Sequence, residues 1–131
     1  MAYVSQELKA ELSPAIKAVL KKYSVKGTIA VRHHSTLVVN IKSGVIDFIG
    51  NYNEVTGGDL HGNPRLGNID VNPYWYHDHF SNVAKDFLIE LFAAMKGDKW
   101  FDRSDIQTDY FNTAYYLDVN IGQWNKPYQV I

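Results

Sequence analysis

Residues 28–42, TIAVRHHSTLVVNIK, decide the fold because apolar and polar side chains alternate on both sides of a polar break. The apolar positions that share this period of two are Ile29, Val31, Leu37, Val39 and Ile41. A period of two is typical of β-strands that bury one face. The break, His33-His34-Ser35, is short enough for a hairpin turn. The stretch therefore predicts two antiparallel strands, over residues 28–33 and 36–42.

Two flanking stretches carry apolar residues at the three- and four-residue spacing of amphipathic helices. The first predicts a helix over residues 5–23, with Lys and Glu on its other face. Pro14 lies inside it, so either Ser13 caps a second helix there or one helix bends. The second predicts a helix over residues 79–96 that ends at Gly97.

A last strand is predicted over residues 115–121, again from alternation. Residues 45–49 favour an edge strand or an anchored loop, and residues 50–79 are rich in Gly, Asn, Asp and Pro, which predicts a long irregular loop with a short strand at 68–71. The element order predicts an α+β fold in which two amphipathic helices cover one face of an antiparallel sheet, made of the N-terminal hairpin and the C-terminal strand. The predicted core positions are Ile29, Val31, Leu37, Val39, Ile41, Phe87, Leu88, Leu91, Leu117, Val119 and Ile121.

Length and composition favour one soluble domain, residues 1–131. Apolar residues make up 46% and charged residues 21%, which is ordinary for a globular chain. The absence of cysteine excludes disulfides and thiol chemistry and suits a reducing cytoplasm. The first residues are polar and amphipathic, and no stretch approaches the roughly 18 apolar residues of a membrane span. We therefore expect a cytoplasmic protein that contacts no membrane.

The net charge of −1 conceals an asymmetry along the chain. Residues 1–44 carry seven basic and two acidic side chains, a net charge of +5, and residues 45–131 carry six and twelve, a net charge of −6. These charges are either ordinary solvated surface charges, or they attract an oppositely charged partner. That partner would be another molecule or a second copy of the chain, in a homo-oligomer. A nucleic-acid-binding protein remains an alternative, through Lys17, Lys21, Lys22, Lys26, Arg32 and Lys42. We do not expect nucleic acid as the partner because the rest of the chain is acidic.

Five histidines raise the questions of metal binding and catalysis. His77 and His79 form an H-x-H pair, but a metal needs three or four converging ligands, so no metal site is predicted. His34 and His79 each begin an H-x-[S/T] unit, the arrangement of two-histidine phosphoesterases, in which imidazoles act as general acid and base. A nucleotide- or phosphoester-directed enzyme or ligand sponge using His34 and His79 is therefore an alternative. Those enzymes carry both units on strands, whereas one lies here at a turn and the other at a helix start.

Aromatic residues make up 14% of the chain and are the remaining feature of the sequence that bears on function. Most are expected to be core residues. Residues 73–76, PYWY, lie in a polar context where three rings are difficult to bury together, which favours a contact surface. The predicted partner-binding residues are Tyr74, Trp75, Tyr76, His77 and His79. No catalytic residue is assigned, and no cofactor is predicted, because the glycines at 57, 58, 62 and 67 lack the flanking strand and helix of a phosphate-binding loop.

Three segments carry a family resemblance: VRHHSTLVVNIKSGVIDFIG (residues 31–50), VNPYWYHDHF (71–80) and DIQTDYFNTAYYLDVNIGQWNKPY (105–128). Together they resemble a family of small bacteriophage and mobile-element proteins classed among the large-polyvalent-protein-associated domains. The resemblance implies a phage-encoded accessory protein that acts in the host cytoplasm, and it assigns no catalytic residues. We therefore expect a non-enzymatic protein that binds and modulates a host protein or complex, as a counter-defence factor.

Overall fold

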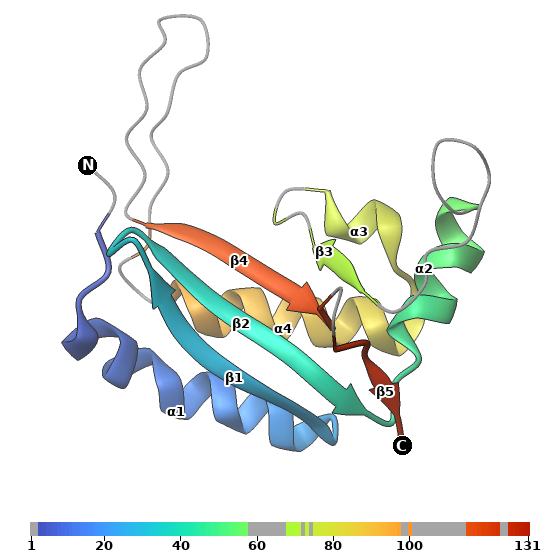
Figure 1. The fold of residues 1–131 in the computed structure, drawn as a ribbon, viewed down its shortest axis with the longest axis horizontal. Helices are drawn as coiled ribbons and strands as arrows, with labels where there is room; N and C mark the ends of the chain where they lie inside the picture. Colours follow the sequence, from blue (N-terminus) through green and yellow to red (C-terminus); the bar gives the residue numbers. More distant parts are fainter. Residues whose placement is uncertain are drawn as a thin grey trace, which may run out of the picture.

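The computed structural model describes residues 3–57, 68–71, 73, 75–97, 100, 115–123 and 126–131. Within these ranges the chain forms four helices and a five-stranded sheet (Figure 1). In chain order the elements are α1 (Gln6–Lys22), β1 (Val25–Arg32), β2 (Thr36–Gly44), α2 (Phe48–Thr56), β3 (Ile69–Val71), α3 (Tyr76–His79), α4 (Asn82–Lys96), β4 (Tyr116–Ile121) and β5 (Gln129–Val130). The α+β fold class predicted from the sequence is confirmed.

α1 is one continuous helix despite the proline inside it. The hydroxyl of Ser5 caps its first turn by accepting a hydrogen bond from the Leu8 amide at 3.0 Å. Pro14 has no N–H to donate to the carbonyl four residues before it. In the same turn Ser13 Oγ donates to the Lys9 carbonyl at 2.6 Å. Of the two alternatives left open by the sequence, a second helix capped by Ser13 is wrong.

Residues 33–35 connect β1 to β2, and the two histidines that interrupt the alternating pattern are the central residues of the turn. His33 and His34 have φ angles of 54° and 56°, and the Ser35 amide donates to the Arg32 carbonyl at 3.2 Å. Positive φ at both central residues is the geometry that matches the twist of a tight hairpin. The predicted antiparallel hairpin is therefore confirmed.

The sheet is mostly antiparallel, but β4 joins the hairpin in parallel. The strand order is β1-β2-β4-β3, and β5 pairs in parallel with the end of β2. β4 runs parallel because the chain returns from the end of β2 to the end of the sheet where β2 began, and α4 lies on this return path (Figure 1). The sequence analysis predicted this strand as part of an antiparallel sheet, and for its pairing with the hairpin that orientation is wrong.

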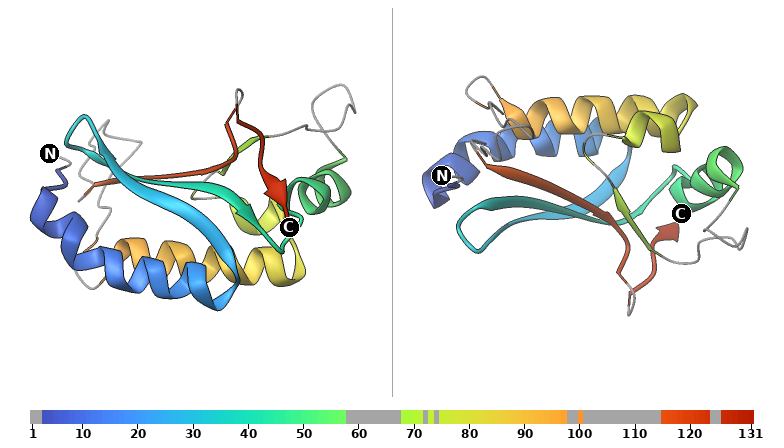
Figure 2. Two further views of the ribbon diagram at one scale, coloured as in Figure 1. Left: turned by 60° about the horizontal axis from the view of Figure 1, so that its bottom comes forward. Right: turned by 90° about the horizontal axis from the view of Figure 1, so that it is seen from above.

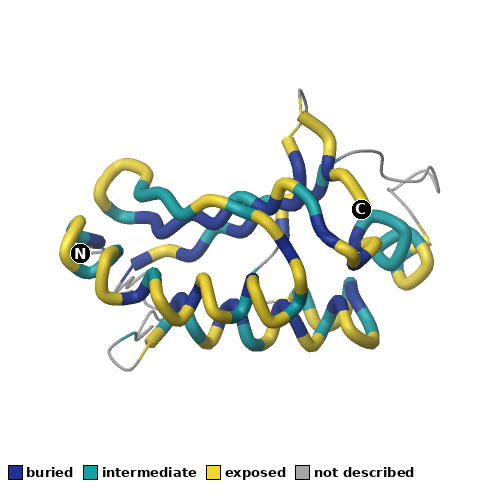
Figure 3. The backbone as a smooth tube through the Cα atoms, turned by 90° about the horizontal axis from the view of Figure 1, so that it is seen from below, coloured by how far each residue is buried: buried dark blue, intermediate teal, exposed yellow. Residues whose placement is uncertain are grey.

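α1 and α4 cover one face of the sheet, as predicted (Figure 2). Figure 3 shows the buried positions facing one another between the helical layer and the strands. The predicted core residues Leu37, Val39, Ile41, Phe87, Leu88, Leu91, Leu117, Val119 and Ile121 are buried. Ile29 and Val31 pack against this core and are partly exposed, because β1 is an edge strand.

The two helices are also joined by polar contacts at their exposed edge. Lys22 Nζ lies 2.7 Å from a carboxylate oxygen of Glu90, and the hydroxyl of Tyr23 donates to the other carboxylate oxygen. These contacts lower the pKa of Glu90, with the Lys22 hydrogen bond as the first cause. α4 begins three residues later than predicted and ends at Gly97 as predicted. Over the described ranges, no helix combines the length and the apolar character needed to cross a membrane.

Part of the segment from residue 45 to 57 forms the helix α2, where the sequence predicted an edge strand or loop. α2 begins after Asp47, whose carboxylate accepts from the Gly50 amide at 2.9 Å, and ends at Gly57 with φ of 77°. Phe48 is fully buried and meets the Phe80 and Tyr128 rings edge-on. The helix is fixed by this burial rather than by the helix propensity of its residues, which explains why the pattern missed it.

The remainder of the predicted loop contains two further short elements. The strand expected at residues 68–71 is confirmed as β3. Residues 76–79 form the single-turn helix α3, which the sequence analysis did not expect as a separate element. Residues 58–67 of the predicted loop lie outside the described residues.

Candidate functional site

The backbone around α3 is held between α2 and α4. Trp75 precedes α3, and its carbonyl accepts from the Asp78 amide at 2.9 Å. At the junction with α4, the Ser81 amide donates to Asn51 Oδ1 at 2.9 Å, and Asn51 Nδ2 donates to Ser81 Oγ at 2.9 Å. This reciprocal pair connects α2 to the first residue before α4. The aromatic segment therefore rests on a fixed support.

The aromatic side chains of α3 divide into packed and exposed ones. Tyr76 stacks on Phe92 of α4, with ring centroids 4.7 Å apart and planes 28° apart. The removal of water by this packing raises the pKa of Tyr76. His77 meets the Tyr76 ring edge-on at 5.5 Å. Trp75, in contrast, is 59% exposed.

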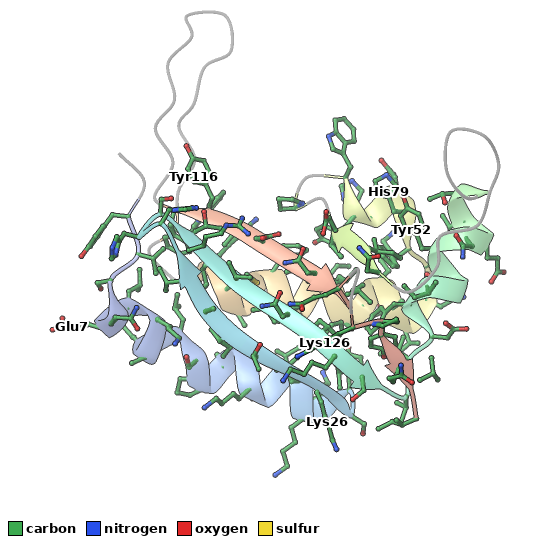
Figure 4. The ribbon with its side chains drawn as sticks, in the orientation of Figure 1. Glu7, Lys26, Tyr52, His79, Tyr116 and Lys126 are labelled. Carbon is green, nitrogen blue, oxygen red and sulfur yellow. The ribbon has the colours of Figure 1, made fainter. Side chains whose placement is uncertain are left out.

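A second ring pair lies at the other end of α3. The His79 ring meets Tyr52 of α2 edge-on at 5.7 Å, and Tyr52 also packs on Phe80 at 5.6 Å. Figure 4 shows the Tyr52 and His79 side chains next to each other. We call the set Tyr52, Trp75, Tyr76, His77 and His79 the α3 patch. The sequence analysis missed Tyr52, because nothing in the pattern placed α2 beside α3.

Of the five residues predicted for partner binding, four belong to the α3 patch: Trp75, Tyr76, His77 and His79. The fifth, Tyr74, lies outside the described residues. Packing separates the two rings of the H-x-H pair, since His77 contacts Tyr76 and His79 contacts Tyr52. In the parts of the chain that the structure describes, no three His, Asp or Glu side chains converge as a metal site requires.

The two histidines of the phosphoesterase alternative occupy opposite ends of the sheet. His34 lies in the β1–β2 turn, where its carbonyl accepts from the Val4 amide at 2.7 Å. His79 ends α3, which lies beside β3 and away from the β1–β2 turn (Figure 1). A phosphate requires both imidazoles within hydrogen-bond reach. This arrangement does not bring His34 and His79 together.

Two of the six cations considered above for nucleic-acid binding form ion pairs. Lys22 is bound to Glu90, and Arg32 Nη1 lies 2.9 Å from Asp118 Oδ2. The other four are exposed side chains on three elements: Lys17, Lys21, Lys26 and Lys42.

The face of the sheet away from α1 and α4 carries a polar network that the sequence analysis did not anticipate. The Arg32–Asp118 pair joins β1 to β4 across β2, on the same face as Val38, which is only 5% exposed. Asn120 Nδ2 donates to Asn40 Oδ1 at 3.1 Å and lies 3.3 Å from Asp118 Oδ2. The parallel register brings these residues together, so only knowledge of the β2–β4 pairing would have revealed them.

Comparison with known proteins found no matching family model, no matching curated protein and no matching solved structure. The resemblance to the phage and mobile-element family therefore stays a prediction.

Proposed function

We propose that this chain is a non-catalytic binding protein that engages a protein partner through the α3 patch. The observation that carries the proposal is the exposure of Trp75, a residue that is 59% exposed although the backbone beside it is fixed on two helices. Trp and Tyr are enriched among the residues that dominate binding energy at interfaces. A large apolar ring presented on a rigid base fits that role.

The packing of the α3 patch lowers the entropy that binding has to overcome. Tyr76 is immobilised against Phe92, and His79 is supported by Tyr52, so little side-chain freedom remains to be lost when a partner arrives. His77 and Asp78 are exposed beside Trp75 and supply polar groups at the edge. The patch therefore suits a partner with an apolar pocket for the indole and a polar rim around it.

The resemblance supports a more specific context for this binding. We extend the proposal to a bacteriophage accessory protein whose partner is a host macromolecule, a component of a defence or nucleic-acid-processing system. The exposure of Trp75 is an observation of the structure that does not use the family resemblance, so the binding role can be tested without the context.

The test begins with affinity capture of the tagged chain from phage-infected bacteria, followed by quantitative mass spectrometry. Proteins recovered with the wild type and lost with Trp75→Ala are then purified and titrated directly. We expect Trp75→Ala to weaken the affinity by about 1 to 4 kcal/mol, which is roughly fivefold to a thousandfold, because an anchoring aromatic side chain is removed.

Tyr116→Ala is the matched control. Tyr116 is an aromatic residue of β4 that is 49% exposed at the other end of the sheet (Figure 4). We expect its affinity to stay within about twofold of the wild type, since surface changes away from an interface have small effects. Equal losses for Trp75→Ala and Tyr116→Ala would contradict the proposal. Loss of the biological activity in His34→Ala, with binding intact, would instead support the phosphoesterase alternative.

A further inference from the structure

The free edge of β1 is a second surface with a distinct chemistry. β1 is the first strand of the order β1-β2-β4-β3, and among the described strands it pairs only with β2. Over its eight residues, Val25–Arg32, alternate peptide groups therefore point their N–H and C=O away from the sheet. Such a row is a template for one more strand.

A groove lies beside part of this edge, at residues 27–29. A hollow of about 800 Å³ lies between α1 and β1. α1 contributes the Lys9 and Lys17 side chains, and apolar surface comes from Leu20 of α1 and Ile29 of β1. A groove between a helix and a sheet edge is the geometry in which extended peptides bind by strand addition.

The charge of this groove indicates which kind of segment would bind in it. Lys9, Lys17 and nearby Lys26 are basic, and none of the described residues that line the hollow is acidic. A carboxylate on every second residue of an added strand would be placed on the side of these lysines, because side chains alternate across a strand. Complementary charge also accelerates encounter and selects against basic segments.

A second copy of the chain is a poorer occupant than an acidic segment. In the antiparallel register centred on Ile29, Lys26 of each copy would face Arg32 of the other, since the two residues lie at equal distances from the centre. Like charges directly opposite each other destabilise a strand pair. The lysines of the two α1 helices would add to this repulsion.

We propose that the β1 edge binds an extended acidic segment of a partner protein by strand addition, with its carboxylates facing Lys9 and Lys17. This surface is separate from the α3 patch, so the inference does not rest on the function proposed above. A protein partner could engage both surfaces, and each can be tested alone.

The probe is a fluorescent peptide of eight residues with alternating glutamate and valine, titrated by fluorescence anisotropy at low salt. Hydrogen exchange of residues 25–32 should slow when the peptide is bound, because peptide groups of the free edge become hydrogen-bonded. Lys9→Glu/Lys17→Glu should weaken binding at least about tenfold. Lys21→Glu/Lys85→Glu, which changes the net charge equally outside the groove, should change binding by less than about threefold.

Two N-methylated peptides separate strand addition from simple charge attraction. One carries its methyl groups on the glutamate amides and the other on the valine amides, so the charges are identical. In an added strand only one of these sets bonds to β1. We expect one peptide to lose at least about tenfold in affinity and the other to bind as the parent does.

Several results would overturn the inference. Equal affinities for the two methylated peptides would show attraction without strand addition, and unchanged exchange in residues 25–32 would place the peptide elsewhere. A single-stranded oligonucleotide of equal charge that binds more tightly at the same lysines would assign the surface to nucleic acid. Trp75→Ala should bind the peptide as the wild type does. A result that contradicts strand addition at the β1 edge can therefore be distinguished from one that contradicts partner binding at the α3 patch.

Discussion

Two buried tyrosines use their hydroxyl groups to hold separate segments of the chain together. The Tyr115 hydroxyl lies 2.6 Å from the Met95 carbonyl and 2.8 Å from the Lys96 carbonyl, at the end of α4. The Tyr128 hydroxyl donates to the Ile46 carbonyl at 2.7 Å. Burial raises the pKa of each tyrosine to about 12, with a further contribution from Asp47 at Tyr128.

These raised pKa values predict a loss of stability in alkaline solution. An unfolded tyrosine ionises near pH 10.0, so between pH 10 and 12 the unfolded chain has lost protons that Tyr115 and Tyr128 still hold in the folded protein. Ionisation of these groups therefore leaves the free energy of unfolding unchanged below pH 10 and lowers it as the pH rises through 12. The loss is up to about 3 kcal/mol per tyrosine. Urea unfolding across this pH range measures it.

The double variant Tyr115→Phe/Tyr128→Phe is the control for other groups that titrate in the same range. It should be less stable below pH 10 by about 1 kcal/mol for each lost hydrogen bond. Above pH 10 its stability should fall less steeply than that of the wild type. Identical slopes for the two proteins would show that these tyrosines are not the cause.

At the α3 patch, individual binding residues could be predicted from the sequence, but the side chains that they contact in the folded protein could not. Trp75 stood out because a large ring in a polar segment has few ways to be buried. The stacking of Tyr76 on Phe92 and the contact of His79 with Tyr52 depend on how α2 and α4 sit beside α3. That arrangement is set by tertiary packing, which residue periodicity does not encode.

At the scale of elements, α4 contributes many of the buried residues of the core. Two adjacent residues of this helix differ in burial, so one can serve as the control for the other. Leu88 is fully buried, whereas its neighbour Ile89 is 44% exposed. Leu88→Ala should lower the free energy of unfolding by about 2 to 5 kcal/mol, because it removes buried apolar surface and leaves a cavity. Ile89→Ala should change it by no more than about 0.5 kcal/mol. Chemical denaturation of both variants checks the prediction, and similar midpoints would contradict the packing of α4.

The elements with clear periodicity were predictable, and those fixed by distant contacts were not. α1, α4 and the hairpin follow from apolar spacing that one buried face imposes on a helix or strand. α2 has Gly50, Asn51 and Asn53 in its middle, and it depends on the burial of Phe48. The parallel orientation of β4 depends on the path of the chain, which the same alternation would fit equally well in either direction.

At the scale of the whole molecule, the basic first third does not form a continuous cationic field. Lys22 and Arg32 are engaged with Glu90 and Asp118, which belong to the acidic remainder of the chain. Fixed pairs of this kind shorten the reach of both charges.

We therefore expect weak binding of duplex DNA, with a dissociation constant above about 1 µM at physiological salt. Anisotropy titrations at several salt concentrations measure both the affinity and its salt dependence. Each phosphate neutralised by a lysine adds a slope of roughly 0.9 to the logarithmic plot. A sub-micromolar affinity with a steep slope would show that the remaining lysines act together on nucleic acid.

The position of β2 in the sheet has a consequence for the order in which the protein assembles during synthesis. β2 ends at Gly44, yet its second edge is completed by β4 and β5, which begin at Tyr116 and Gln129. At ordinary rates of translation the hairpin waits on the order of ten seconds for these strands. During that interval β2 presents an open edge of apolar sequence to other nascent chains. We expect α1, which is synthesised before the hairpin and packs against β1, to cover the apolar face of the hairpin during this interval.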